Sequence, residues 1–146
     1  MRELVKLLDE NFEYESHESS GGTLYIYVVS NRKEAACPNC GLPSDKVHSW
    51  YKRRFKDLPI QGMKVELVLN NRVLFCKNDD CPCRTFAETF DCLPRKAKRS
   101  RRLTEKIVNI SLEVSSVTAS EILRDGIADV GKSTVCSLLK KRHATN

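Results

Sequence analysis

The sequence lacks any run of 18 or more apolar residues, so it offers no segment long enough to span a membrane as a helix. Its first 15 residues are rich in acidic side chains and lack the apolar core of a secretion signal. It also has no internal repeat and no low-complexity segment. These absences favour a cytoplasmic protein over a membrane-bound or secreted one.

Positive charge is scarce at the start of the chain and concentrated at its end. Residues 1–36 hold four basic and seven acidic side chains, a net charge of −3. Residues 37–93 hold nine basic and seven acidic, a net of +2, and residues 94–146 hold twelve basic and five acidic, a net of +7. This asymmetry predicts an anionic partner for the C-terminal part.

With 146 residues and 40% hydrophobic content, the chain is long enough for one ordinary domain or two small ones. Small domains bury little hydrophobic core, so two of them would need additional stabilisation from a cross-link. The seven cysteines are the candidates for it. In a reducing cytoplasm, cysteines are metal ligands or buried thiols more often than disulfides.

The N-terminal part is expected to be rich in β-structure. A short helix is expected over residues 3–9. Aromatic and β-branched residues at 12–15 and 23–30 then flank the sequence Ser19-Ser20-Gly21-Gly22. This combination predicts a first hairpin with a tight turn.

A second pair of strands is expected at about 46–55 and 63–75, separated by residues 57–62. In the second segment apolar residues occupy every other position from Val65 to Leu69. That alternation is typical of a half-buried strand.

Two pairs of cysteines have the spacing of a zinc site. Cys37 and Cys40 form a C-x-x-C-G sequence, and 35 residues separate Cys40 from the second pair, Cys76 and Cys81. Zinc prefers four ligands in a tetrahedron, and Gly41 lets the backbone turn after the first pair. One β-hairpin between the pairs would bring them together as in a zinc ribbon. We therefore predict a Zn²⁺ ion bound by these four cysteines.

The fourth ligand is the least constrained, since four residues separate the two cysteines of the second pair. Cys83, Cys92 and His48 are alternatives to Cys81. Unmetallated buried thiols are the alternative to the whole site. Cys136 lies on the flank of a predicted helix and is interpreted as a packing residue.

The character of the sequence changes at Pro94, where a basic run without apolar periodicity begins. We interpret residues 94–102 as a flexible linker whose cations follow DNA phosphates or enter a minor groove. A solvated linker without a partner is the alternative. The candidate DNA contacts in this region are Arg95, Lys96, Lys98, Arg99, Arg101 and Arg102.

Three short helices are predicted after the linker. In the first, Leu103 shares one helix face with apolar residues four, seven and eleven positions later. The second is expected to begin at the capping box of residues 118–121 and to stop at Gly126. The third is expected over residues 132–142. Its inward-facing residues are Val135, Leu138 and Leu139.

The third helix has the division of a recognition helix, with short polar side chains and lysines on or near the face opposite its apolar residues. Such side chains meet base edges and phosphates in a major groove. An ordinary solvated helix face is the alternative. The candidate DNA contacts here are Lys132, Ser133, Ser137, Lys140 and Lys141.

Residues 126–133 match the phosphate-loop pattern G-x-x-x-x-G-K-S, but we predict no nucleotide partner. That loop works between a buried parallel strand and a helix. Here a helix is expected before the match, and 13 residues follow Ser133. The same residues fit the turn of a helix-turn-helix, with Gly126 ending one helix and Gly131 near the N-cap of the next.

The order of these motifs resembles the N-terminal region of the ISL-three family of insertion-sequence transposases, over roughly residues 20–142. The motifs are CPNCG (37–41), VHSWYKRRFKDLPIQG (47–62), RVLFCKNDDC (72–81), TFAE (85–88) and PRKAKRSRRLTEKI (94–107). In that family a zinc finger is followed by a helix-turn-helix and then by an RNase H-like domain with three acidic catalytic residues. The resemblance implies that Cys37, Cys40, Cys76 and Cys81 hold the metal and that residues 103–142 form the helix-turn-helix.

We therefore expect an α+β protein with a β-rich zinc ribbon-like domain (1–93), a basic linker (94–102) and a trihelical helix-turn-helix domain (103–146). Its expected function is sequence-specific binding of double-stranded DNA at the terminal inverted repeats of a transposon. No chemistry of its own is expected, because a catalytic domain needs on the order of 100 further residues to hold its carboxylates. The chain is then a truncated reading frame, an isolated domain region or a stand-alone derivative.

Two rival functions use the same modules. A zinc-containing transcriptional regulator would bind a promoter in place of transposon ends. A zinc ribbon acting as a protein-interaction module would bind no duplex, and its helices would serve dimerisation. A homodimer is compatible with all three functions, and no membrane partner is expected.

Overall fold

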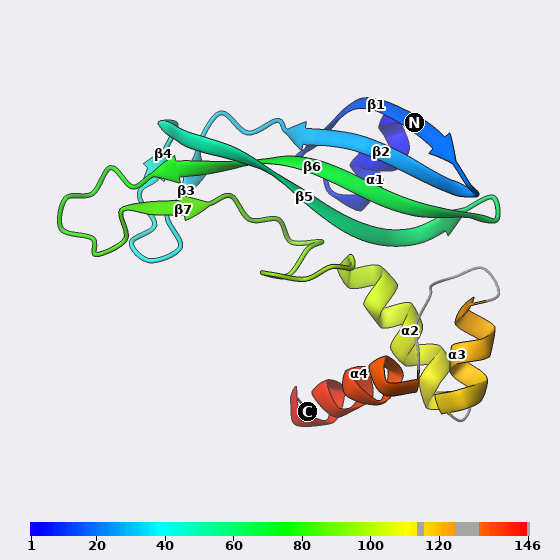
Figure 1. Ribbon diagram of the computed structural model, residues 1–146. Coiled ribbons are helices and arrows are strands. Elements are labelled where there is room, and N and C mark those ends of the chain that lie inside the picture. The colour runs from blue at the N-terminus through cyan, green and yellow to red at the C-terminus, as the bar shows by residue number, and fades with distance from the viewer. Residues whose placement is uncertain (114–115, 125–131, 146) are drawn as a thin grey trace.

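The computed structural model describes residues 1–113, 116–124 and 132–145 (Figure 1). The elements are α1 (Arg2–Leu8), β1 (Phe12–Ser20), β2 (Thr23–Ser30), β3 (Ala35–Ala36), β4 (Pro43–Ser44), β5 (Val47–Ile60), β6 (Met63–Phe75), β7 (Thr85–Ala87), α2 (Arg101–Glu113), α3 (Ser116–Arg124) and α4 (Lys132–Thr145). The expected α+β composition is confirmed. Within the described ranges, no helix is long and apolar enough to cross a membrane.

The main sheet has the strand order β1-β2-β6-β5, and β7 pairs with the end of β6. Both predicted hairpins are present, as β1–β2 and β5–β6. Between them β2 and β6 run parallel, from Thr23 opposite Lys64 to Val29 opposite Asn70. The two hairpin turns lie at the same end of the sheet, where the Lys64 N–H donates to the Gly22 carbonyl at 3.2 Å. The second strands of the two hairpins leave their turns in the same direction and therefore pair in parallel.

The second hairpin is longer than the sequence predicted. β5 continues through Asp57 to Ile60, and the turn is confined to Gln61 and Gly62, whose φ angles are 50° and 78°. Two successive residues with positive φ are typical of a tight two-residue hairpin turn. An irregularity between Asp57 and Ile60 accommodates Pro59, which has no N–H for the ladder.

One face of the sheet carries the main core. α1 packs on this face through Val5, and phenylalanine rings from three segments meet there. The ring centroid of Phe12 lies 4.5 Å from that of Phe90 and 6.1 Å from that of Phe55. The predicted alternation in β6 is confirmed by the burial of Val65, Leu67 and Leu69 in this core.

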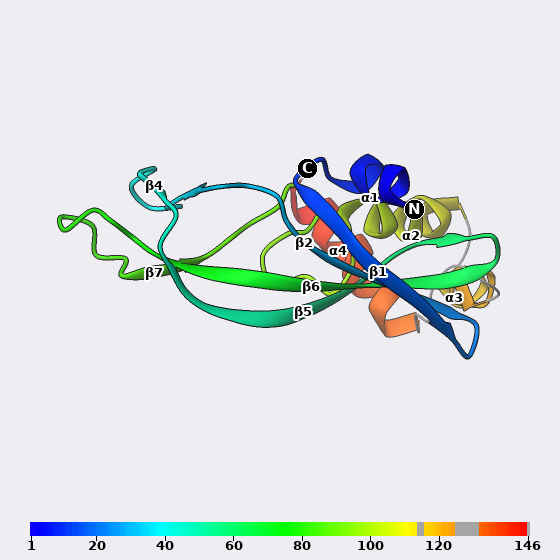
Figure 2. The same cartoon turned by 90° about the horizontal axis from the view of Figure 1, so that it is seen from above.

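The three C-terminal helices pack around a separate aliphatic core. Its buried members are Leu103, Ile107, Ala119, Leu123 and Val135, with Ile110, Leu138 and Leu139 partly buried. The inward faces predicted for the first and third helices are thus confirmed where they are described, and Val114 lies outside the described residues. Leu58 of β5 also packs on this core. The helices lie beyond the β5 edge of the sheet, as Figures 1 and 2 show together.

Two helix starts differ from the sequence prediction. α2 begins at Arg101, earlier than the expected start at residue 103. α3 begins at Ser116, so the capping box predicted at Thr118 was wrong. Thr118 therefore lies within the first turns of the helix, followed by the buried Ala119 and Ser120. α4 begins at Lys132 as predicted and continues to Thr145. The turn expected over residues 126–131 lies outside the described residues.

The segment 94–100, expected as a flexible linker, lies along the outer edge of β5. The Lys56 N–H donates to the Lys98 carbonyl at 3.0 Å, and the Ser100 N–H donates to the Lys56 carbonyl at 2.8 Å. The Arg53 guanidinium adds two bonds to carbonyl oxygens of the segment. These bonds hold the segment against the sheet and cover part of an edge strand.

A buried carboxylate fixes the junction between the sheet and α2. The Asp57 side chain is 4% exposed and accepts hydrogen bonds from Ser100 Oγ at 2.7 Å and Arg102 Nε at 2.8 Å. Ser100 Oγ in turn accepts from the Leu103 N–H at 3.3 Å, so Ser100 caps the helix. The hydrogen bond to Asp57 raises the pKa of Arg102. One carboxylate therefore joins the hairpin, the basic segment and the first helix of the C-terminal unit.

Candidate metal centre

The first cysteine pair lies in a tight turn between two short strands. β3 and β4 pair through Ala35 with Ser44 and Ala36 with Pro43, directly outside the turn. Inside it, the Gly41 N–H donates to the Cys37 carbonyl at 2.8 Å. Gly41 has a φ of 76°, which an L side chain rarely adopts. The C-x-x-C-G sequence therefore folds locally into a loop that directs both sulfurs to one side.

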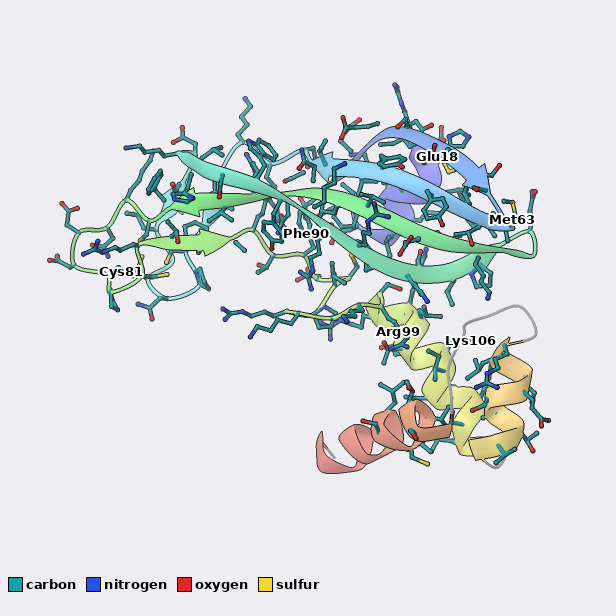
Figure 3. All side chains as sticks on the ribbon, viewed as in Figure 1. Glu18, Met63, Cys81, Phe90, Arg99 and Lys106 are labelled. Carbon is teal, nitrogen blue, oxygen red and sulfur yellow. The ribbon has the colours of Figure 1, made fainter. Side chains whose placement is uncertain are left out.

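The second cysteine pair follows β6, and an asparagine compensates for its wider spacing. The Asn78 side-chain oxygen accepts a hydrogen bond from the Asp80 N–H at 3.0 Å. The Asn78 backbone carbonyl accepts one from the Cys81 N–H at 3.1 Å. These two bonds fold the loop back, so that Cys81 returns to Cys76. The loop lies at the end of the sheet far from the hairpin turn, as the labels of Cys81 and Met63 in Figure 3 show.

The sulfurs of Cys37, Cys40, Cys76 and Cys81 lie within 4.8 Å of one another. Cys40 Sγ is 3.6 Å from Cys76 Sγ, and Cys37 Sγ is 4.0 Å from Cys81 Sγ. Zinc–sulfur bonds of about 2.3 Å imply tetrahedral edges of roughly 3.8 Å. The observed separations bracket that value and are far too long for disulfides, whose bond length is about 2.05 Å. The cluster therefore fits Zn²⁺ in both donor chemistry and size.

Backbone N–H groups favour the thiolate form at the first pair. The N–H of Cys40 donates to Cys37 and lowers the pKa of Cys37 to about 6. The N–H of Leu42 donates to Cys40 and lowers the pKa of Cys40. Since zinc binds thiolates, the turn prepares these two ligands before the metal arrives.

Cys76 of the second pair holds its proton more firmly. The Asn78 N–H lowers the pKa of Cys76, but burial and the sulfurs of Cys40, Cys37 and Cys81 together raise it to about 12. Four negative sulfurs this close cannot all ionise without a cation between them. A dication at the centre supplies that compensation.

The residues that competed for the fourth ligand position lie outside the cluster. Cys83 Sγ donates to the Thr85 carbonyl at 3.1 Å, and burial raises its pKa. Cys92 packs against the main core. His48 is exposed and lies edge-on to the Phe75 ring, with 4.9 Å between ring centroids. Among the described residues, the cysteine quartet is thus the one predicted from the spacing.

Residues 33–83 match the family described as the zinc-finger of the transposases of IS204, IS1001, IS1096 and IS1165. Residues 33–83, with their cysteine quartet, are thus similar to a transposase zinc finger. The chain is also similar to a Bordetella parapertussis protein named transposase for insertion sequence element IS1001, with 38% identity over 60 residues. The matched region is 41% of this chain and 15% of that relative. No solved structure matches. The resemblance seen in the motif order is confirmed for this region.

Two asparagines of the zinc finger were missed by sequence reasoning. Asn39 Nδ2 donates to Cys81 Sγ at 3.1 Å and so links the two cysteine pairs. Asn78 shapes the second loop, as described above. The signal available in the sequence was their position inside the two cysteine loops, because asparagine often bonds to nearby backbone in turns.

A buried ion-pair network supports the zinc finger from the sheet, and sequence reasoning missed it as well. Glu88, whose side chain is 0% exposed, accepts from Arg72 Nε at 2.9 Å and also from Ser30 Oγ. Arg32 lies 3.4 Å from the same carboxylate and donates to the Thr89 carbonyl. The network joins β2, β6 and the segment after β7. Glu88 closes the TFAE motif, which was the only hint of its role.

The predicted DNA contacts fall into four groups, one of which is Arg99 alone, half-buried beside Lys56 of β5. Arg95, Lys96 and Lys98 are exposed, as are Ser133 and Ser137 on α4. Two arginines at the start of α2 are engaged within the protein, since Arg101 donates to the Asp91 carbonyl and Arg102 pairs with Asp57. The side chains of Lys132, Lys140 and Lys141 lie outside the described residues, although their backbone belongs to α4.

Proposed function

We propose that this chain binds the terminal inverted repeats of an insertion sequence, as the non-catalytic N-terminal part of a transposase. The observation that carries the proposal is the transposase zinc finger joined to a strongly basic helical unit. The name of the similar Bordetella parapertussis protein supports the same role. The proposal assigns the chain no chemical step and places it in the cytoplasm, where DNA is accessible and thiols stay reduced.

The basic segment 94–100 serves phosphate contact in this proposal. Its backbone is held on β5, which leaves Arg95, Lys96 and Lys98 exposed at defined positions. Cations that are pre-positioned lose less conformational entropy on binding than cations on a flexible arm. Arg102 has a structural role instead, because its guanidinium is bound to Asp57.

α4 serves base recognition in this proposal, as the second helix of a helix-turn-helix. Val135 is buried between the helices, whereas Ser133 and Ser137 are exposed on the other side of α4. Short polar side chains at such positions suit base edges in a major groove. The lysines near the end of α4 would then meet phosphates.

The zinc finger serves as a structural element beside these contacts. When bound, the metal cross-links the turn of residues 37–40 to the loop of residues 76–81. Cys37 packs with Leu74 and Phe86 in a small core, so the cross-link also orders the end of β6 and β7. We expect its loss to impair DNA binding through unfolding.

The test is a salt titration of binding to an inverted-repeat duplex and to a scrambled duplex of the same length. With about five to seven phosphate contacts, log affinity should fall against log salt with a slope of about −4.5 to −6. Replacing Arg95, Lys96 and Lys98 by alanine should weaken both complexes equally and flatten the slope by about two to three. Replacing Ser133 or Ser137 by alanine should change which duplex is preferred and leave the slope nearly unchanged.

A matched control removes three exposed cations elsewhere, by replacing Arg2, Lys6 and Lys33 with alanine. It should affect the slope far less than the basic-segment variant. Equal affinity for both duplexes would favour non-specific binding and contradict the proposal. Selective binding to promoter DNA would favour a regulator, and no binding to any duplex would favour a protein-interaction module.

A further inference from the structure

The outward face of β5 carries a row of exposed cations that starts at a tryptophan. From Ser49 to Asp57 the strand pairs with β6 without interruption, so side chains alternate strictly between its two faces. Phe55 and Asp57 point into the core and are buried. The alternate positions, all exposed, are Trp50, Lys52, Arg54 and Lys56.

The basic segment extends this row by one residue. Arg99 forms a bridge with Lys56 on the outer edge of β5, and bridged residues project from the same face of a sheet. Within the described residues, Arg99 Nε is buried without a hydrogen-bond partner. Figure 3 shows Arg99 directly below β5, between the sheet and the helices. Arg99 therefore extends the row at its Lys56 end.

No helix covers this face in the described ranges. α1 packs on the opposite face of the sheet, which is the far face in Figure 1 and the upper side in Figure 2. Arg54 pairs with the Glu66 carboxylate of β6 at 3.9 Å. An ion pair this long, with an exposed arginine, is weak. Within the described residues, Lys52 and Lys56 form no salt bridge.

The row ends at an exposed aromatic ring. Trp50 is 52% exposed, although large aromatic side chains are normally well covered. A hollow of about 220 Å³ beside Lys52 is bordered by Tyr27 and Glu15 and floored by Val68. An exposed indole beside regularly spaced cations is the arrangement by which proteins stack a base and hold the attached phosphates.

We propose that this face of β5 binds a single strand of DNA, with Trp50 stacked on an unpaired base and Lys52, Arg54, Lys56 and Arg99 holding phosphates. In a duplex, neighbouring bases cover both faces of each base, so a lone exposed indole finds a free ring on unpaired DNA. The choice of DNA rests on the proposed function. The surface itself is separate from α4 and would act where a transposon end is opened or frayed.

Trp50 reports on its own site, because it is the single tryptophan of the chain. The experiment titrates the full chain with a thymidine 20-mer and follows tryptophan emission, with a labelled 20-mer for anisotropy. We expect quenching that saturates, and a log–log salt slope of about −2 to −3 at ~0.7 per phosphate contact. The same thymidine 20-mer paired with its complementary deoxyadenosine strand should quench the tryptophan emission much less.

Variants separate stacking from charge. Trp50→Leu should weaken strand binding about tenfold, whereas Trp50→Phe should retain part of the affinity because it keeps a ring. The triple variant K52A/R54A/K56A should flatten the salt slope by about two, at ~0.7 per contact. The control variant R2A/K6A/K33A removes the same charge and should leave the slope nearly unchanged.

Unchanged Trp50 emission at saturating strand, or equal effects of the two triple variants, would overturn the proposal. Tighter binding of a uridine 20-mer than of the thymidine 20-mer would overturn the assignment to DNA. A failure of the proposed function looks different, since it is a loss of discrimination between inverted-repeat and scrambled duplexes by the unaltered chain. Trp50→Leu should leave that discrimination intact.

Discussion

The sheet half and the helical half of this chain are stabilised in different ways. The sheet half has three packed phenylalanine rings, a buried ion-pair network and a cysteine quartet. The helical half has a small aliphatic core, and it is anchored to the sheet through Leu58 and the Asp57–Arg102 pair. A small domain thus gains stability either from internal cross-links or from docking on a neighbour. The two halves should accordingly fail under different perturbations.

Zinc removal should give the largest effect and should separate the halves. Structural zinc contributes an apparent ~10–16 kcal/mol of binding free energy in isolated finger peptides. Cys37→Ser or Cys76→Ser should therefore lose the single equivalent of zinc and unfold residues 33–83, while the helical circular dichroism signal persists. Metal analysis and near-ultraviolet circular dichroism measure both effects. Cys136→Ser, in α4, is the control and should retain the metal.

A chelator should reproduce the cysteine variants. Persistence of the native sheet signal after complete zinc removal would contradict the assignment of a structural metal. Simultaneous loss of the helical signal would show that the helical half depends on the sheet half for its stability.

Removing Glu88 should give the next largest effect, confined to the sheet half. Glu88→Ala leaves the Arg72 guanidinium buried without its carboxylate, and breaking such a pair costs about 3–5 kcal/mol. Urea unfolding, followed by Trp50 emission, measures the loss. The double variant R72M/E88L should recover much of the stability, because an apolar pair avoids burying a lone charge. A double variant no better than the single one would show that the network is irreplaceable for another reason.

Asp57→Asn should loosen the docking of the helical half by about 2 kcal/mol. The substitution weakens the helix cap at Ser100, and such a cap contributes about 0.5–2 kcal/mol. It also weakens the ion pair between residue 57 and Arg102, which solvent partly screens because Arg102 is 40% exposed. Hydrogen exchange should accelerate in α2 before it does in β6. Asp45→Asn, which disturbs an exposed pair with Lys77, is the matched control and should have little measurable effect. Unchanged exchange in α2 would contradict the anchoring role.

Cys92 should give the smallest effect on stability and a clear pH signature. Burial, followed by the nearby Asp9 carboxylate, raises the pKa of Cys92 to about 12. The folded state keeps this proton while the unfolded state releases it above its ordinary thiol pKa, so the contribution of Cys92 to stability falls as pH rises between the two values. Iodoacetamide at pH 8 should label Cys92 in the unfolded protein and spare Cys92 in the folded chain. Cys92→Ala should keep one equivalent of zinc, and loss of the metal would make Cys92 a ligand.

Local patterns were readable from the sequence. The C-x-x-C-G turn, both hairpins and the apolar faces of two helices depend on residues near one another in the chain, and all of them are present. The capping box was wrong because α3 already begins at Ser116, so Thr118 lies inside the helix. The predicted end of β5 was wrong because an irregularity in the strand accommodates Pro59, whereas a proline in a sequence usually indicates the end of a strand.

The sequence by itself determined the metal-binding chemistry, the two-part organisation and the concentration of charge near the C-terminus. The spacing predicted Cys81 as the fourth ligand but left Cys83, Cys92 and His48 open, and the tertiary structure decided among them, because the direction of a side chain depends on how its loop folds back. The tertiary structure also decided which cations are available: Arg102 is bound to a buried aspartate, whereas Arg99 lies beside the β5 row. A charge is visible in the sequence, but its partner is fixed by contacts between residues more than 40 positions apart in the chain.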